Sequence, residues 1–279
     1  MIRLFFTYLL ALIAITACQK DFLEASSSGQ EIILSVEGSE MDTYPATKVT
    51  AETSVPSSLY FAGTTGTSTQ TSKWAPSSTK KTVSSGKIST GYYQTATPTA
   101  YNYYLSNRSM TFTTSGCTIS ASGLLYDVVV GIAKGSKSAS PTIELKHIFA
   151  RTGEVNVTST NGYTLSNLYV YIQSNTGGGT GGTYNIYTGQ WSDISAGSEM
   201  NLDSSSDRYL IPGSYKITVS CKRTKGTFSD TFNGSVDVTL YEGYINNISI
   251  SLTGDPAVPI KASTSITPWG TTTLSGTPS

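Results

Sequence analysis

Short runs in which apolar and polar residues alternate constrain the fold of this sequence more than any other feature. In Thr142–His147 the alternation is clean and places Ile143, Leu145 and His147 on one face of an extended strand. Similar strand-like runs recur between clusters of Ser, Thr, Gly and Pro that are typical of turns, and none has a helical period. These runs are 31–37, 58–62, 99–105, 110–112, 124–132, 168–172, 184–187, 215–221, 235–240 and 247–252. The sequence therefore predicts an all-β protein.

The N-terminus predicts a secretory signal. One positive charge is followed by an apolar run over residues 4–15, which is shorter than the roughly 20 residues that span a bilayer. Small residues then precede Cys18, and the stretch 15–18 resembles the lipobox of bacterial lipoproteins. We therefore expect cleavage between Ala17 and Cys18 and acylation of Cys18, because two or three acyl chains hold a protein at a membrane. The alternative is an ordinary signal peptide with an incidental cysteine.

The length of the chain favours two domains. About 260 residues remain after the signal, which is enough for each half to bury its own core. The expected organisation is a signal peptide 1–17, a lipidated flexible tether 18–29, an N-terminal β-sandwich 30–153 and a C-terminal β-sandwich 154–279. The 18 basic and 18 acidic side chains balance, so no electrostatic field favours nucleic acid as a partner.

No residue pattern in the sequence indicates catalysis. His147 is the only histidine, which excludes a zinc site built on paired histidines and favours a satisfied core histidine. The run 176–183 is rich in glycine but lacks the Gly-Lys-Ser/Thr ending of a phosphate loop, so we interpret it as a flexible hairpin loop. Acidic residues are too scattered to nominate a carboxylate pair, although a β-sandwich glycosidase could bring distant ones together. We expect no enzyme, no metal site and no cofactor.

Two further groups of residues have alternative interpretations. Cys117 and Cys221 could pair in an oxidising periplasm, but we expect two buried free thiols. Five tyrosines crowd one region, where they could pack a sandwich core or line a surface for carbohydrate or protein. Alternation puts two of them on one face of a strand and one on the other, so at least one could be exposed. These tyrosines are Tyr92, Tyr93, Tyr101, Tyr103 and Tyr104.

Several segments, taken in order, resemble the fimbrillin-like proteins of Bacteroidales, the subunits of type V pili. The resemblance covers nearly the whole chain after the lipobox, and no single motif in it is decisive. The segments are the strand 31–36 with the basic Lys48 behind it, Tyr92-Tyr93, 101–104, 127–130, the histidine-containing 143–151, 187–191, 211–215 and 266–269.

The resemblance implies two tandem transthyretin-like (Greek-key) β-sandwiches, exported through the periplasm as an outer-membrane lipoprotein. It implies a shaft, tip or anchor subunit that assembles with other pilus subunits by strand exchange and acts in cell-surface adhesion, with a host protein or glycan as receptor. The polar loop after the first strand carries Lys48, so we expect a trypsin-like protease to cut Lys48-Val49. The alternative is a monomeric glycan-binding outer-membrane lipoprotein with a shallow platform of exposed aromatics.

The C-terminal segment 260–269 has a period of two and follows a proline-bearing break. As a closing strand it would turn Ile260, Ala262, Thr264 and Ile266 toward the core of its own domain. As a donor strand it would place the same four side chains in a neighbouring subunit, where the first strand had been. We expect the closing arrangement in the isolated monomer.

Overall fold

The computed structural model describes residues 29–37, 55–66, 73–95, 100–113, 116–122, 127–202, 208–253 and 259–268. In these ranges the chain forms strands and turns, which confirms the expected all-β fold. No helix in the same ranges is long and apolar enough to cross a membrane. Ala17, Cys18, Lys48 and Val49, on which the lipidation and processing predictions depend, lie outside the described residues.

The strands form four sheets. The largest sheet has the order β3-β2-β5-β8-β9-β1-β4 and contains β1 (Gln30–Glu37), β2 (Ser58–Thr65), β3 (Lys73–Thr82), β4 (Lys87–Gln94), β5 (Tyr101–Ser106), β8 (Val129–Ser136) and β9 (Thr142–His147). A small sheet has the order β13-β12-β7-β6 and contains β6 (Thr111–Thr113), β7 (Gly116–Ser122), β12 (Gly181–Asn185) and β13 (Gln190–Ser195).

Two more four-stranded sheets make up the other end of the molecule. One has the order β15-β10-β18-β19 and contains β10 (Ala150–Ser159), β15 (Tyr209–Leu210), β18 (Tyr244–Leu252) and β19 (Ile260–Pro268). The other has the order β14-β11-β16-β17 and contains β11 (Thr164–Ser174), β14 (Met200–Asn201), β16 (Gly213–Lys225) and β17 (Phe228–Leu240).

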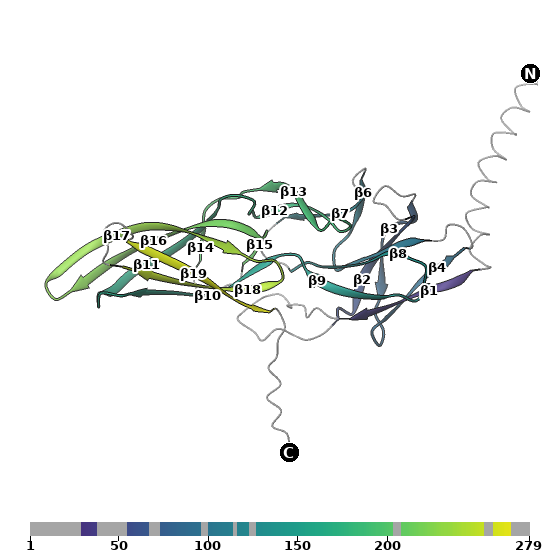
Figure 1. The fold of residues 1–279 in the computed structure, drawn as a ribbon, viewed down its shortest axis with the longest axis horizontal. Coiled ribbons are helices and arrows are strands. Elements are labelled where there is room, and N and C mark those ends of the chain that lie inside the picture. Colours follow the sequence, from purple (N-terminus) through teal and green to yellow (C-terminus); the bar gives the residue numbers. More distant parts are fainter. Residues whose placement is uncertain are drawn as a thin grey trace, which may run out of the picture.

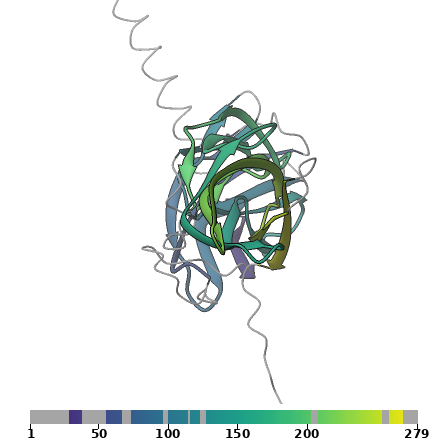
Figure 2. The same cartoon turned by 90° about the vertical axis from the view of Figure 1, so that its left-hand side faces the viewer.

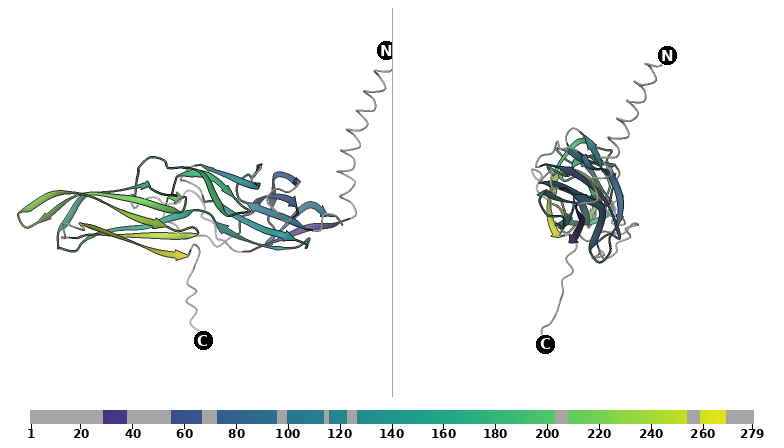
Figure 3. Two further views of the ribbon diagram at one scale, coloured as in Figure 1. Left: turned by 45° about the horizontal axis from the view of Figure 1, so that its top comes forward. Right: turned by 90° about the vertical axis from the view of Figure 1, so that its right-hand side faces the viewer.

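The molecule is elongated, with the seven-stranded sheet at one end and the β16–β17 hairpin reaching furthest at the other (Figure 1). Figure 2 shows the molecule from that hairpin end, along its long axis. A tilted view shows β19 running beside β18 on one side of this half, with β16 and β17 on the other (Figure 3). The hairpin turns tightly because Gly226 adopts a positive φ of 59°, which suits the twist of paired strands.

The buried apolar side chains form three clusters. One fills the space between the sheets β15-β10-β18-β19 and β14-β11-β16-β17. A second cluster is formed by inward side chains of the strands of the seven-stranded sheet. A third lies between that sheet and the small sheet. Strand β5 separates these last two clusters, because Tyr103 contributes to one and Tyr104 to the other.

The burial of β5 on both faces corrects one expectation from the sequence. All six of its residues are buried, including Tyr101, Tyr103 and Tyr104, so the idea that one of these tyrosines could be exposed is wrong. Alternation assigned the tyrosines correctly to two faces, but it could not show that the small sheet covers the second face. Tyr92 and Tyr93 are half-buried.

Hydrogen-bonded pairing crosses the predicted domain boundary. Residues 153 and 154 lie within the single strand β10, which pairs in parallel with β18. Beyond that boundary in the sequence, β12 pairs along its whole length with β7, which precedes it. The division into 30–153 and 154–279 therefore stays a prediction, and the small sheet joins both segments.

The glycine-rich run is not the flexible hairpin loop that we expected. It connects β11 and β12, which lie in different sheets, and its backbone is held by Tyr215. The N–H of Gly179 donates to the Tyr215 hydroxyl over 2.8 Å, and that hydroxyl donates to the Ile211 carbonyl over 2.6 Å. A Cβ at Gly178 would lie 2.6 Å from the Tyr215 ring, so glycine is needed there for close approach.

Candidate functional site

Strand β1 occupies an inner position of the seven-stranded sheet. It pairs antiparallel with the edge strand β4 and parallel with β9. Alternation along β1 turns Ile32, Leu34 and Val36 into the core and leaves Ile33 partly exposed. The three inward side chains belong to the same cluster as Ile88 of β4 and other residues of β2, β5, β8 and β9. The strand therefore completes a core that the rest of the sheet builds.

Hydrogen bonds hold β1 in place on both sides. The Ile33 N–H donates to the Ala139 carbonyl over 2.9 Å, and the Ser35 N–H donates to the Pro141 carbonyl over 3.1 Å. On the β4 side, the buried Thr90 hydroxyl donates to the Ile32 carbonyl over 2.9 Å. Removal of β1 would leave the Ala139 and Pro141 carbonyls before β9, and the Thr90 hydroxyl of β4, without these partners, beside an uncovered apolar core.

The chain connectivity makes β1 separable from the rest of the fold. The next strand, β2, begins at Ser58, and the predicted processing bond Lys48-Val49 lies between the two strands in the sequence. A cut anywhere in residues 38–54 would leave β1 attached only to the N-terminal piece. The site of the cut stays a prediction, because these residues are outside the described ranges.

Strand β19 is the edge strand of its sheet and pairs antiparallel with β18 from Leu252↔Ile260 to Tyr244↔Pro268. This is the closing arrangement within a single chain. The four side chains singled out from the sequence are not equally covered: Ile260 is 7% exposed and belongs to the core, Ala262 and Thr264 are half-buried, and Ile266 is 45% exposed. The C-terminal half of β19 therefore contributes little to the core that it borders. Its donor role stays a prediction.

His147 lies at the end of β9 in the interior, as expected for a core histidine. Its Nδ1 atom is 2.7 Å from Oδ2 of Asp127, and the two side chains are almost completely buried. Asn107 orients this segment further, because its amide donates to the Asp127 carbonyl over 2.9 Å. The pair ties the end of β9 to the residues that precede β8. In the described part of the chain, no group of three or more His, Cys, Asp or Glu residues could hold a metal ion.

The two thiols are free and buried, as the sequence predicted. They lie in different cores: Cys117, on β7 of the small sheet, belongs to the cluster between that sheet and the seven-stranded sheet, and Cys221, on β16, belongs to the cluster between the two sheets of the other end. Burial raises the pKa of the Cys117 thiol to about 12, so it stays protonated at neutral pH.

A second surface of interest lies on the outward face of β11, which alternation along the strand defines. Val170 and Ile172 point into the core, so Tyr169, Tyr171 and Gln173 point outward. The rings of Tyr169 and Tyr171 lie 6.5 Å apart with planes only 15° from parallel. Sequence reasoning included this strand but did not single out the two tyrosines, although the same period-two pattern would have placed them on the solvent side.

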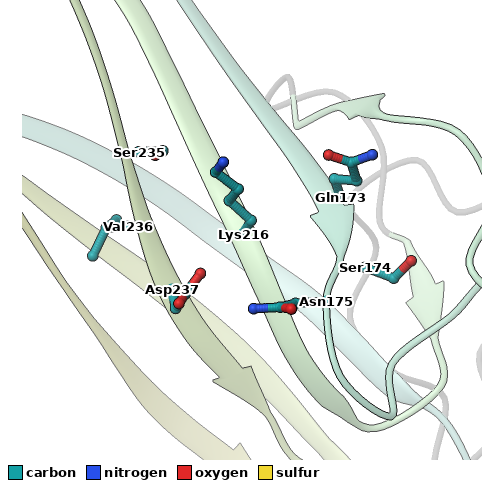
Figure 4. A pocket seen from close by; sticks show the side chains of 7 residues that line it. All are labelled: Gln173, Ser174, Asn175, Lys216, Ser235, Val236 and Asp237. Atoms are coloured by element: carbon teal, nitrogen blue, oxygen red, sulfur yellow. The ribbon is translucent and has the colours of Figure 1, made fainter.

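The outward residues of three neighbouring strands form regular cross-strand rows. One row is Gln173, Lys216 and Asp237, the next is Tyr171, Thr218 and Ser235, and the third is Tyr169, Ser220 and Asn233. An open hollow of about 480 Å³ lies over the first rows, and its lining is mainly polar (Figure 4). The lining residues are Gln173, Ser174, Asn175, Lys216, Ser235, Val236 and Asp237.

This arrangement of sheets is the fold of fimbrial and candidate cell-adhesion proteins of Bacteroidales. A fimbrial protein of Bacteroides vulgatus matches with a TM-score of 0.53 and 11% identity, over 86% of this chain and 99% of that one. A candidate cell adhesion protein of Parabacteroides distasonis matches with a TM-score of 0.54 and 11% identity, over 87% and 98% of the two chains. One of Bacteroides uniformis matches with a TM-score of 0.51 and 13% identity, over 86% and 98%.

The expected resemblance is confirmed at the level of the fold. No protein-family model matches the sequence, and no curated protein is similar to it. At these identities the matches establish the architecture alone, so assembly and location have to be argued from the geometry of this chain.

Proposed function

We propose that this chain is a structural, non-catalytic subunit of a type V-like pilus that acts in adhesion at the cell surface. The observation that carries the proposal is β1, a core strand that a single cut in residues 38–54 would separate from the rest of the fold. The fimbrial protein among the structural neighbours supports the same role.

The burial of β1 supports assembly by strand exchange. Loss of the strand uncovers the apolar side chains that Ile32, Leu34 and Val36 had covered, and it frees backbone groups on β4 and β9. An extended segment of a second subunit can restore both, through main-chain hydrogen bonds and alternate side chains. A subunit processed in this way is stable only when it is joined to a neighbour, which is the property that a polymer requires.

Strand β19 is the donor that we propose. It has nine residues against eight in β1, and it presents alternate side chains in the same way. Within its own subunit, β19 buries Ile260 but leaves Ile266 45% exposed. Detaching β19 therefore uncovers less apolar surface than detaching β1. The exchange is therefore favoured by the difference between β19, in which only Ile260 is buried, and β1, whose three inward apolar side chains are all buried.

Truncation before Ile260 tests the donor role. We expect the truncated monomer to keep a cooperative unfolding transition while cells lose the denaturant-resistant ladder of polymers. Normal ladders from the truncated protein would exclude β19 as the donor. A large loss of melting temperature, with no polymer from the full chain either, would support a closing strand in a tip or anchor subunit.

Processing at Lys48-Val49 is tested by the N-terminal sequence of the assembled protein. We expect polymers to begin at Val49, and the Lys48→Gln variant to remain unprocessed and monomeric, whereas Lys80→Gln, in the exposed part of β3, is processed normally. Polymers that begin at Cys18 would indicate an anchor subunit, which keeps its first strand and its lipid. A start well beyond Ala51 would contradict the proposed site.

Export as an outer-membrane lipoprotein is tested at Cys18. We expect the wild-type protein to incorporate a labelled fatty acid and to fractionate with the outer membrane. The Cys18→Ala variant should take up no label and leave the membrane fraction. Label on the variant, or its retention in the membrane, would contradict lipidation at this residue.

A further inference from the structure

The outward face of β11, β16 and β17 combines a pair of aromatic rings with rows of polar side chains. Tyr169 is 51% exposed, Tyr171 is half-buried, and the planes of the two rings are only 15° from parallel. Beside them lie amide, hydroxyl, ammonium and carboxylate groups in register. Isolated exposed aromatics need no explanation, but aromatic rings beside a few placed polar groups are a common feature of ligand sites.

We propose that this face binds a neutral oligosaccharide chain. The apolar C–H face of a sugar ring packs against an aromatic ring, and its hydroxyls need both donors and acceptors. The tyrosine pair provides the stacking surface. The hollow beside it provides the Gln173 and Asn175 amides, the Lys216 ammonium and the Asp237 carboxylate, whose side chains Figure 4 shows along its rim.

The dimensions and the charge both agree with this ligand. Residues 169 and 173 are four positions apart on one strand, which is about 13 Å at roughly 3.3 Å per residue, so the surface accommodates more than one sugar unit. The hollow of about 480 Å³ is within the usual range for small-molecule sites. The rows contain one cation, Lys216, paired in register with one carboxylate, Asp237, so their charges cancel and favour an uncharged ligand.

The composition of the face argues against a protein partner. The centre of a protein interface is enriched in aromatic residues, Met and Arg, and it is depleted of Lys, Asp and Ser. Here the two tyrosines are surrounded by Thr218, Ser220 and Ser235, which are small hydroxyl residues. Such a surface gives hydrogen bonds but little apolar area to bury. A neutral oligosaccharide would be the receptor in the adhesion role proposed above, on which this inference rests. The binding face and β19 belong to different sheets.

The experiment measures binding of purified monomer to four neutral hexasaccharides, namely cellohexaose, maltohexaose, xylohexaose and mannohexaose, with tetragalacturonate as the charged comparison. We expect at least one neutral chain to bind by calorimetry, with an affinity that changes little between about 50 and about 500 mM salt. Tyr169→Ala and Tyr171→Ala should each weaken binding at least tenfold, and Tyr169→Phe should preserve it because stacking needs the ring.

Tyr244→Ala is the matched control, because Tyr244 is 36% exposed on the opposite sheet of the same half. It should bind as the wild type does, and all variants should melt at the wild-type temperature. The proposal is overturned if no neutral hexasaccharide binds at millimolar concentration, if only tetragalacturonate binds, or if the two tyrosine variants bind normally. Self-association of the ligand-free protein that Tyr169→Ala abolishes would also overturn it, by assigning the face to a second copy. Because the binding assay uses purified monomer, a lack of glycan binding would contradict this inference alone. The polymer ladder and the N-terminal sequence test the proposed pilus role separately.

Discussion

Leu34 is the residue at which the importance of β1 can be measured most directly. It lies in the middle of the strand, is 0% exposed, and packs in the core inside the seven-stranded sheet. Leu34→Ala should cost about 2–5 kcal/mol, because the lost burial and the remaining cavity both destabilise the folded state. A domain is usually stable by only about 5–15 kcal/mol in total, so this single change should be visible in any unfolding curve.

The measurement is urea unfolding followed by tyrosine fluorescence, with Ile33→Ala as the control. Ile33 is the adjacent aliphatic residue on the same strand, but it is 38% exposed, so its truncation should cost well under half as much. Equal losses for the two variants, or a loss below about 1 kcal/mol for Leu34→Ala, would refute the argument that β1 completes the core.

Deletion of residues 30–37 extends the same test to the whole strand. Burying Ile32, Leu34 and Val36 contributes about 1.5–3 kcal/mol each, or roughly 5–9 kcal/mol together. Loss of that amount is comparable to the entire stability of a domain. The deleted protein should therefore lose cooperative unfolding of this end and regain it when a peptide of residues 29–38 is added. A deleted protein that unfolds as the full chain does would show that the strand is dispensable.

Three further predictions concern buried polar groups. Burial raises the pKa of Tyr103 and of Tyr104 to about 12, whereas the unfolded chain ionises near pH 10, so stability should hold up to about pH 10 and fall toward pH 12 in thermal unfolding. The Cys117 thiol should react with a maleimide at pH 8 only after denaturation. Tyr215→Phe should cost about 1–3 kcal/mol in urea unfolding, because backbone groups of the glycine-rich run lose their partner; a cost near zero would contradict this.

The sequence predicted strands best where one face is buried and the other is solvated. The predicted bounds of Thr142–His147 agree with those of β9, because the alternation in this segment reflects a single buried face. Strand β3 was missed, since Lys73–Thr82 carries few apolar residues and lies at a sheet edge. Strand β10 was missed because its first three residues are all buried, and the alternation of burial begins only after them. Local periodicity cannot reveal strands whose burial is decided by distant partners.

The candidate sites show the same division between local and distant information. The inward face of β1 follows from its own alternation, and so does the outward pair Tyr169 and Tyr171. The alternation of β1 does not show which strands flank it, because the residues of β9 and β4 that pair with it lie more than fifty positions further along the chain. The rows of polar groups on the outer sheet also depend on the register of β16 with β11 and β17, which no single segment specifies.

The two proposals place no conflicting demands on the chain. Strand exchange would use β19, on the sheet β15-β10-β18-β19, whereas the tyrosine pair lies on the outward face of the sheet β14-β11-β16-β17. Strand β19 packs against β17 at the edge of that sheet, but the tyrosine pair lies on β11, which β16 separates from β17. Departure of β19 removes an edge strand whose inner side chains are covered mainly at Ile260, so the outer sheet keeps its own pairing. A subunit joined to its neighbour through β19 would therefore still present Tyr169 and Tyr171 to a ligand, and Tyr169→Ala should abolish glycan binding without changing the polymer ladder.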